Sequence, residues 1–114
     1  MARQLHHVIN DILETIARVE QITRGKSFQD FEGSWQLRWI VQRALEIISE
    51  ASRAIPDEIA NTRPEIPWRK VRGIGNVLRH EYEGLSDRII WNVVTDELPR
   101  LKTAVEALAA AQDQ

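Results

Sequence analysis

The sequence of 114 residues contains no cysteine. Without cysteine the chain cannot form a disulfide framework, a thiolate metal site or a thiol nucleophile. This composition fits the reducing conditions of the cytoplasm, which is the expected location. The chain also lacks an apolar run of the ~18 residues that a membrane span needs. Its first stretch, MARQLHHVINDIL, is amphipathic and has no continuous apolar segment of the kind found in a secretory signal.

An excess of charge of one sign is also missing. The 15 basic and 17 acidic side chains give a formal net charge of -2, so the chain as a whole does not attract nucleic acid. Any contact with RNA has to come from a local basic patch. With 43% hydrophobic and 28% charged residues, residues 1–114 are expected to fold as one globular domain with a core.

Apolar side chains recur at three- and four-residue spacing, which is typical of amphipathic helices. The first helix is expected at about residues 4–23, ended by Gly25 in the left-handed conformation. The second is expected at about 34–54, with Ser34 as its N-cap. The residues predicted to form the buried face of this second helix are Ile40, Ala44, Ile47, Ile48 and Ala51.

The stretch PDEIANTRPEIPW contains three prolines, which predicts a turn, one short helix and an extended connection. A third helix is expected at about residues 67–83. Residues 86–87 offer an N-cap for the next helix, and Asp96 offers another, with Pro99 tolerated in the first turn of the last helix. The pattern predicts an all-α bundle of four to five helices with short loops.

The run GIGNVLRHEY within the third helix is unusual because it contains Gly73 and Gly75. A glycine inside a helix costs roughly 1 kcal/mol relative to alanine, so each needs a structural or functional reason. One explanation is close approach of another backbone or of a bound phosphate, and an equally good one is tight packing of a neighbouring helix. The apolar residues of this helix are expected to face the core: Val71, Ile74, Val77 and Leu78.

A polar face is predicted on the same helix. Arg72, Asn76 and His80 follow one another at four-residue spacing, with Arg79 beside them. Tyr82 follows at the end of the run. Each residue also has an ordinary explanation: a hydrogen-bonded histidine at a helix edge, a half-buried tyrosine with its hydroxyl in water, and solvated or paired arginines. Physical reasoning alone leaves both explanations open.

The stretch PEIPWRKVRGIGNVLRHEYEGLSDRIIWNVVTDELPRL, preceded by QRALEIISEASRAI, closely resembles the HepT-like toxins, a branch of the HEPN superfamily of small α-helical RNases. The resemblance covers nearly the whole chain. Its most specific parts are the Glu-Ala-x-Arg end of the second helix, the Pro-Trp entry to the third, and the N-x-x-x-H-x-Y motif at Asn76, His80 and Tyr82. It implies a HEPN-type bundle that forms a homodimer, in which two copies of the motif helix face one another across a cleft.

The resemblance also implies metal-independent cleavage of RNA, with tRNA as the expected substrate, no cofactor and no role for DNA. His80 would transfer protons, since a histidine can take the proton of a ribose 2′-hydroxyl or protonate the leaving oxygen. An arginine would stabilise the pentacovalent phosphate, because its guanidinium presents a planar fork of donors. The family partner is a small nucleotidyltransferase antitoxin, MNT, which in some systems transfers AMP to the tyrosine that corresponds to Tyr82.

The sequence departs from the family at one motif position. The family places an arginine five residues before the histidine, and here that position is Gly75. Two arginines are candidates for its role: Arg79, whose side chain leans back toward the N-terminus of the helix, and Arg72, one turn before Asn76. Under the alternative interpretation, the loss is real and the chain is a weakened or inactive RNase that serves as a binding partner.

Charged residues of the second helix match charged positions of the family. The resemblance suggests that Arg43 and Glu50 line or orient the cleft beside His80. Ordinary surface pairing with Glu46, worth ~0.3–0.5 kcal/mol per pair, also explains them. A third, purely structural interpretation of the chain is a helical dimer whose polar helix face is hydrated.

Overall fold

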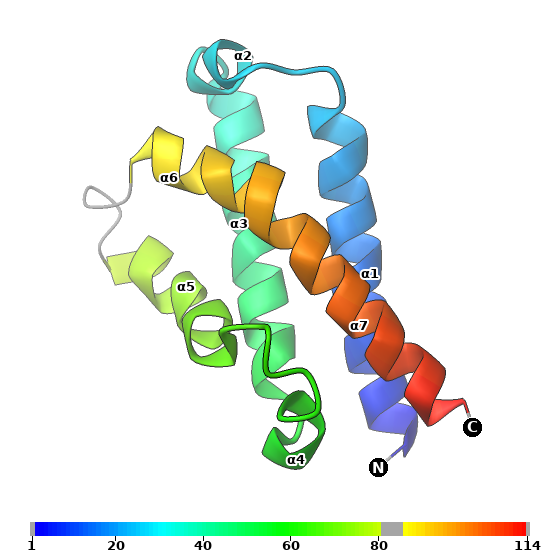
Figure 1. The fold of residues 1–114 in the computed structure, drawn as a ribbon. Helices are drawn as coiled ribbons and strands as arrows, with labels where there is room; N and C mark the ends of the chain where they lie inside the picture. The colour runs from blue at the N-terminus through cyan, green and yellow to red at the C-terminus, as the bar shows by residue number, and fades with distance from the viewer. Residues whose placement is uncertain (1, 81–85, 114) are drawn as a thin grey trace.

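Helices account for the fold of the chain, which is given by a computed structural model that describes residues 2–80 and 86–113 (Figure 1). No strand occurs within these residues, so the predicted all-α fold is confirmed. None of the described helices is long and apolar enough to cross a membrane. The long helices are α1 (Ala2–Thr23), α3 (Trp35–Arg53), α5 (Trp68–His80) and α7 (Leu98–Gln112), and the short ones are α2 (Phe28–Glu32), α4 (Asp57–Ala60) and α6 (Asp87–Asn92).

The arrangement places α3 at the centre. It packs against α1 on one side and against α5 on the other, and α7 runs alongside α1. Figure 1 shows α6 and α7 crossing one side of this group of helices. An ion pair between Lys102 Nζ and Glu20 Oε1, 3.1 Å long, joins α7 to α1. The opposite side of α3 is left uncovered within the described chain, as the exposed side chains along it show.

Three predicted helix boundaries are confirmed. Gly25, just past α1, has a φ of 73°, the left-handed conformation that glycine adopts without strain. The Ser34 hydroxyl accepts the backbone N–H of Leu37 at 3.1 Å, and the Ser86 hydroxyl accepts that of Ile89 at 3.2 Å. Each serine therefore satisfies one of the amide groups that have no partner at the start of a helix.

The break predicted at Asp96 is wrong. Residues Val93–Glu97 form a π-helix that joins α6 to α7 without interruption, and the N–H of Leu98 donates to the carbonyl of Val93 five residues back. Pro99 follows in the first turn of α7. Proline has no N–H and its ring crowds the carbonyl four residues before it, so a wider turn accommodates it without ending the helix.

The buried face of α3 differs in part from the predicted one. Ala44 and Ile48 are buried as expected, but Ile40 is 53% exposed. Apolar residues along α3 form two overlapping stripes, and the position of the neighbouring helices buries only one of them. The hydrophobic residues of the buried stripe are Leu37, Val41, Ala44, Leu45 and Ile48.

Candidate active site

Helix α5 is the most basic helix of the structure. Its sequence, WRKVRGIGNVLRH, contains Arg69, Lys70, Arg72 and Arg79 and no acidic residue. The whole chain has a formal charge of -2, so the residues outside this helix together carry -6. Arg69, Lys70 and Arg79 are exposed, so this helix offers local positive charge of the kind that a contact with RNA requires.

The motif residues lie on the second half of α5. Asn76 and Arg79 are exposed, and they lie one turn apart on the face that is turned away from the core. His80 is the last residue of α5, one turn after Asn76. Tyr82 lies outside the described residues. The backbone of α5 therefore places Asn76, Arg79 and His80 within one turn of each other, as the spacing predicts.

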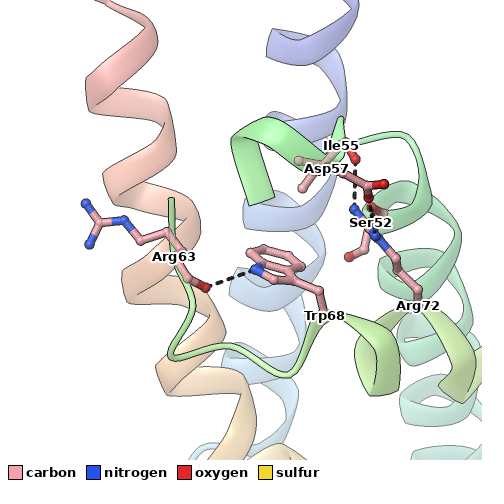
Figure 2. A network of polar contacts seen from close by, with 6 residues as sticks. All are labelled: Ser52, Ile55, Asp57, Arg63, Trp68 and Arg72. Carbon is pink, nitrogen blue, oxygen red and sulfur yellow. Dashed lines mark hydrogen bonds and ion pairs between the residues drawn. The ribbon is translucent and has the colours of Figure 1, made fainter. Parts of the chain in front are cut away.

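Arg72 has a different environment, because its side chain lies against the end of α3 (Figure 2). Its Nε donates to the carbonyl of Ser52 at 3.2 Å and its Nη2 donates to the carbonyl of Ile55 at 2.9 Å. Its Nη1 forms an ion pair of 2.8 Å with Asp57 Oδ1. The Ser52 carbonyl lies in the last turn of α3 and the Ile55 carbonyl lies just past it, so this guanidinium supplies donors to carbonyls at the end of the helix. All three of its nitrogens are occupied by contacts within the fold.

Side chains of α3 also form hydrogen bonds with the backbone of α5. The buried Ser49 hydroxyl of α3 donates to the carbonyl of Arg72 at 2.8 Å and accepts the N–H of Gly75 at 3.1 Å. Arg53 Nε donates to the same carbonyl at 3.0 Å. These bonds and those of the Arg72 side chain fix the position of α5 along α3. They therefore also fix the direction in which Asn76 and Arg79 point.

Gly75 is favoured by this packing. A Cβ atom at position 75 would lie 3.0 Å from Ser49 Oγ and 3.2 Å from Ser49 Cβ, closer than side chains normally approach. Tight helix packing, one of the two explanations offered by the sequence, is therefore correct for Gly75. It does not apply to Gly73, where a Cβ would have no described atom within 4 Å.

Arg79 reaches back toward position 75. Its Nη1 would lie 3.6 Å from a Cβ atom at that position. The side chain thus leans toward the N-terminus of α5, as helical side chains do, and brings its guanidinium beside position 75, where the resemblance leads one to expect an arginine. Sequence spacing alone identified this reach as possible, and the structure has it.

The two supporting residues predicted on α3, Arg43 and Glu50, are both exposed and lie on the side of the helix that α1 and α7 leave open. Arg43 Nη1 forms a 3.3 Å ion pair with Glu46 Oε2, which is the surface pairing that the sequence also allowed. No signal in the charge pattern indicated the importance of Ser49. A small polar residue within an apolar stripe, Leu45-Ile48-Ser49-Ser52, was the only available hint.

The sequence and this geometry agree with comparisons to known proteins. The model of the family described as Ribonuclease HepT-like matches residues 12–108. The chain belongs to the HepT-like ribonuclease family. The matched residues include Asn76, Arg79 and His80.

Two relatives are similar over almost their full length. The chain is 39% identical over 108 residues to "Probable ribonuclease HepT" of Thermococcus cleftensis, a match that covers 95% of this chain and 98% of the relative. It is 35% identical over 104 residues to "Putative RNase MJ1380" of Methanocaldococcus jannaschii, covering 91% and 95%. No solved structure matches the chain. The relatives support a ribonuclease function of this HepT-like chain and leave its substrate open.

Proposed function

We propose that this HepT-like chain is a metal-independent endoribonuclease and the toxin of a toxin–antitoxin pair, acting on cellular RNA in the cytoplasm, with tRNA as its substrate. One observation carries the proposal. The guanidinium of Arg79 lies beside position 75, where the resemblance predicts an arginine, so a cation is available at that position of the helix. The positive charge of α5 supports the choice of a polyanionic substrate.

In the proposed reaction, a ribose 2′-oxygen attacks the adjacent phosphorus and the 5′-oxygen of the next nucleotide leaves. His80 removes the 2′-hydroxyl proton or donates a proton to the leaving oxygen, a role generally worth ~10²–10⁴ in rate. Arg79 donates to non-bridging oxygens, whose negative charge grows in the pentacovalent transition state. Asn76, on the same exposed face, offers an amide donor to the phosphate.

The partners follow from the family. We propose a homodimer in which both motif helices border one cleft, with Arg43 and Glu50 on its wall. We also propose that an MNT-type nucleotidyltransferase neutralises the toxin and attaches AMP to Tyr82. Each AMP adds a negative phosphate close to Arg79 and His80, so it would repel the RNA backbone from the site.

The experiment that tests the activity is cleavage of end-labelled total tRNA by the purified chain without divalent metal. His80→Ala and Arg79→Ala are compared with Arg100→Ala, a matched control that removes an exposed arginine from α7. We expect cleavage by the wild type and the control, and a loss of at least ~10²-fold in both motif variants. Full activity of Arg79→Ala would remove Arg79 from the mechanism.

A second candidate function rests on the close contact between Ser49 and Gly75. Because Ser49 lies close beside Gly75, an arginine at this position is disfavoured, and the chain would then be a binding subunit that only docks the nucleotidyltransferase or offers it Tyr82. In that case the folded wild type leaves tRNA intact. It would still bind the nucleotidyltransferase, and Tyr82→Phe would prevent AMP transfer.

A further inference from the structure

A pocket separates α5 from the segment that runs from α6 to α7. Helix α5 packs chiefly against α3, and on another of its sides a pocket of about 500 Å³ lies between α5, α6, the π-helix and α7 (Figure 1). The buried side chains of Leu45 and Ile48 on α3 form the base of this α5–α7 pocket. Its described lining residues do not include Asn76 or Arg79, so it is separate from the candidate active site. Pockets of this size hold small organic molecules.

The walls of the α5–α7 pocket are aliphatic. Ten of the fourteen described residues that line it are leucine, isoleucine or valine, and none of the fourteen is aromatic. Ile89 is 47% exposed at its edge. A sugar or a nucleotide base would lose its hydrogen bonds to water against such walls, whereas an alkyl chain would bury apolar surface there. The walls therefore favour a ligand with an aliphatic part.

Gly73 keeps the α5–α7 pocket open along α5. It lies within the helix, where glycine costs roughly 1 kcal/mol relative to alanine, and it lines the pocket. A Cβ atom at position 73 would have no described atom within 4 Å, in contrast to Gly75, where Ser49 limits the space. Packing among the described residues therefore does not explain Gly73. A bound molecule does explain it, because glycine lets a ligand approach the helix backbone closely.

Two charged side chains of opposite sign line the α5–α7 pocket. Lys70 belongs to α5, Glu97 is the last residue of the π-helix, and both are exposed. Neither forms an ion pair with another described residue. Each is next to an exposed residue of its own sign, Arg69 and Asp96. One wall is thus positive and the other negative, which is complementary to a head group that carries both charges.

We propose that the α5–α7 pocket binds a zwitterionic amphiphile with a single alkyl chain. The alkyl chain lies on the aliphatic walls beside Gly73, the anionic group lies at Lys70 and the cationic group lies at Glu97. A fatty acid would offer no cation to Glu97, and an alkylammonium would offer no anion to Lys70. The proposal does not depend on cleavage of RNA.

The proposed ligand contacts the helix of the candidate active site from the opposite side. Lys70, Ile74 and Val77 follow one another at four- and three-residue spacing, so they form one stripe of α5 that lines the pocket. Arg79 lies on the other side of the same helix. A ligand in the pocket would connect α5 to α6 and α7, so binding should raise the melting temperature of the chain.

The test is binding of dodecylphosphocholine, a zwitterionic amphiphile, to the purified full chain. It is measured by isothermal titration calorimetry without RNA, below the concentration at which micelles form. Dodecanoate and dodecyltrimethylammonium have the same alkyl tail and a single charge. We expect one dodecylphosphocholine per chain, bound at least ~10-fold more tightly than either singly charged amphiphile.

A substitution in the wall tests the place of binding. Gly73→Leu fills the pocket from α5 and adds a better helix former, so the chain should stay folded while the affinity falls by about 30-fold or more. Ala110→Leu is the matched control, because Ala110 is an exposed residue of α7 outside the described lining of the pocket. It should leave the affinity unchanged.

Charge reversal tests the position of the head group. Lys70→Glu and Glu97→Lys should each weaken binding by about 10-fold, and the two together should restore it, because the exchange keeps one charge of each sign. No binding by the wild type, equal affinity for the three amphiphiles, or full affinity of Gly73→Leu would overturn the proposal. Failure of the double variant to regain affinity would contradict the assigned position of the head group.

Discussion

Arg72 and Arg79 lie two turns apart on α5, and their surroundings give them different roles. The guanidinium of Arg72 contacts two carbonyls at the end of α3 and Asp57, whereas Arg79 is exposed and extends along its own helix toward Gly75. The first arginine connects two helices. The second is accessible to a ligand.

Replacing these arginines should separate stability from activity. Arg72→Ala removes a donor from the Ser52 and Ile55 carbonyls and the ion pair with Asp57, and is expected to lower the free energy of unfolding by about 2 to 3 kcal/mol. Lysine should not restore the loss, because it lacks the planar fork of donors. Arg79→Ala should change stability by less than about 0.5 kcal/mol while reducing cleavage. Urea unfolding measures both values, and equal destabilisation by the two variants would contradict this division.

The two glycines of α5 should respond to alanine with opposite signs. At Gly75 the added methyl meets Ser49, which is 1% exposed and held by two hydrogen bonds, so the side chain cannot easily move. We expect Gly75→Ala to cost about 1 to 2 kcal/mol. Gly73→Ala meets no described atom and should stabilise the helix by roughly 0.5 to 1 kcal/mol.

The comparison of the two alanine variants is made by urea unfolding. A Ser49→Gly background supplies the control, since it removes the atoms that the new methyl would meet and should reduce the cost at position 75. A stabilising Gly75→Ala in the wild-type background would show that Ser49 moves aside.

At the scale of single elements, the short helix α2 depends on a reciprocal cap. The N–H of Ser27 donates to Asp30 Oδ2 at 2.8 Å, and the N–H of Asp30 donates to Ser27 Oγ at 3.1 Å. The backbone hydrogen bond from Ser27, followed by the one from its side chain, lowers the pKa of the Asp30 carboxyl. This cap favours the start of a helix of only five residues.

The lowered pKa fixes the direction of the pH response. Folding favours the ionised form of Asp30. The contribution of this carboxylate to the stability of the fold is therefore complete above its unfolded-state pKa of ~3.9, and it is lost as the pH falls through the lower pKa of the folded state. We expect an NMR titration of the Asp30 carboxyl to give a pKa below ~3.9, and Ser27→Ala to raise it. Asp30→Asn should remove this part of the acid response, and an Asp30 pKa above ~3.9 would contradict the cap.

Sequence reasoning was successful where a single residue type determines local geometry. Gly25, Ser34 and Ser86 mark helix ends through conformations and hydrogen bonds that involve only their own neighbourhood. It failed where the answer depends on the wider chain. Ile40 and Val41 are equally apolar, and only the placement of the neighbouring helices decides which one is buried. The π-helix before Pro99 likewise depends on how the whole α6–α7 segment crosses the bundle.

The candidate site was also predictable only in part. The spacing of Asn76, Arg79 and His80 follows from helix geometry, so their common location could be expected. The contact of Ser49 with Gly75 joins residues that are 26 positions apart, and no local pattern encodes it. The exposure of Trp39 was also not predictable from local sequence. An amphipathic pattern predicts that a tryptophan is buried, and only the packing of the neighbouring helices leaves this one exposed.

At the scale of the whole molecule, charge is divided unevenly. The chain carries -2 and α5 carries +4, so RNA is attracted to one helix and repelled by much of the remaining surface. Binding should therefore be strongly salt-dependent in spite of the acidic chain.

The salt dependence can be assigned to individual side chains. In a His80→Ala background, which prevents cleavage, Arg69→Ala and Arg79→Ala should each reduce the slope of log affinity against log salt concentration by about 0.7 for single-stranded RNA. Arg100→Ala on α7 should leave the slope unchanged. Fluorescence anisotropy with a labelled RNA measures these slopes, and equal effects of all three substitutions would show that binding is not confined to α5.

The contact between Ser49 and Gly75 also limits how the sequence can change over evolutionary time. An arginine at position 75 would place its Cβ 3.0 Å from Ser49 Oγ, so this substitution is disfavoured while the serine keeps its place. A smaller residue at position 49 has to come first, and by itself it removes two hydrogen bonds without any gain in function. The Ser49–Gly75 contact therefore makes an arginine at position 75 depend on the residue at position 49.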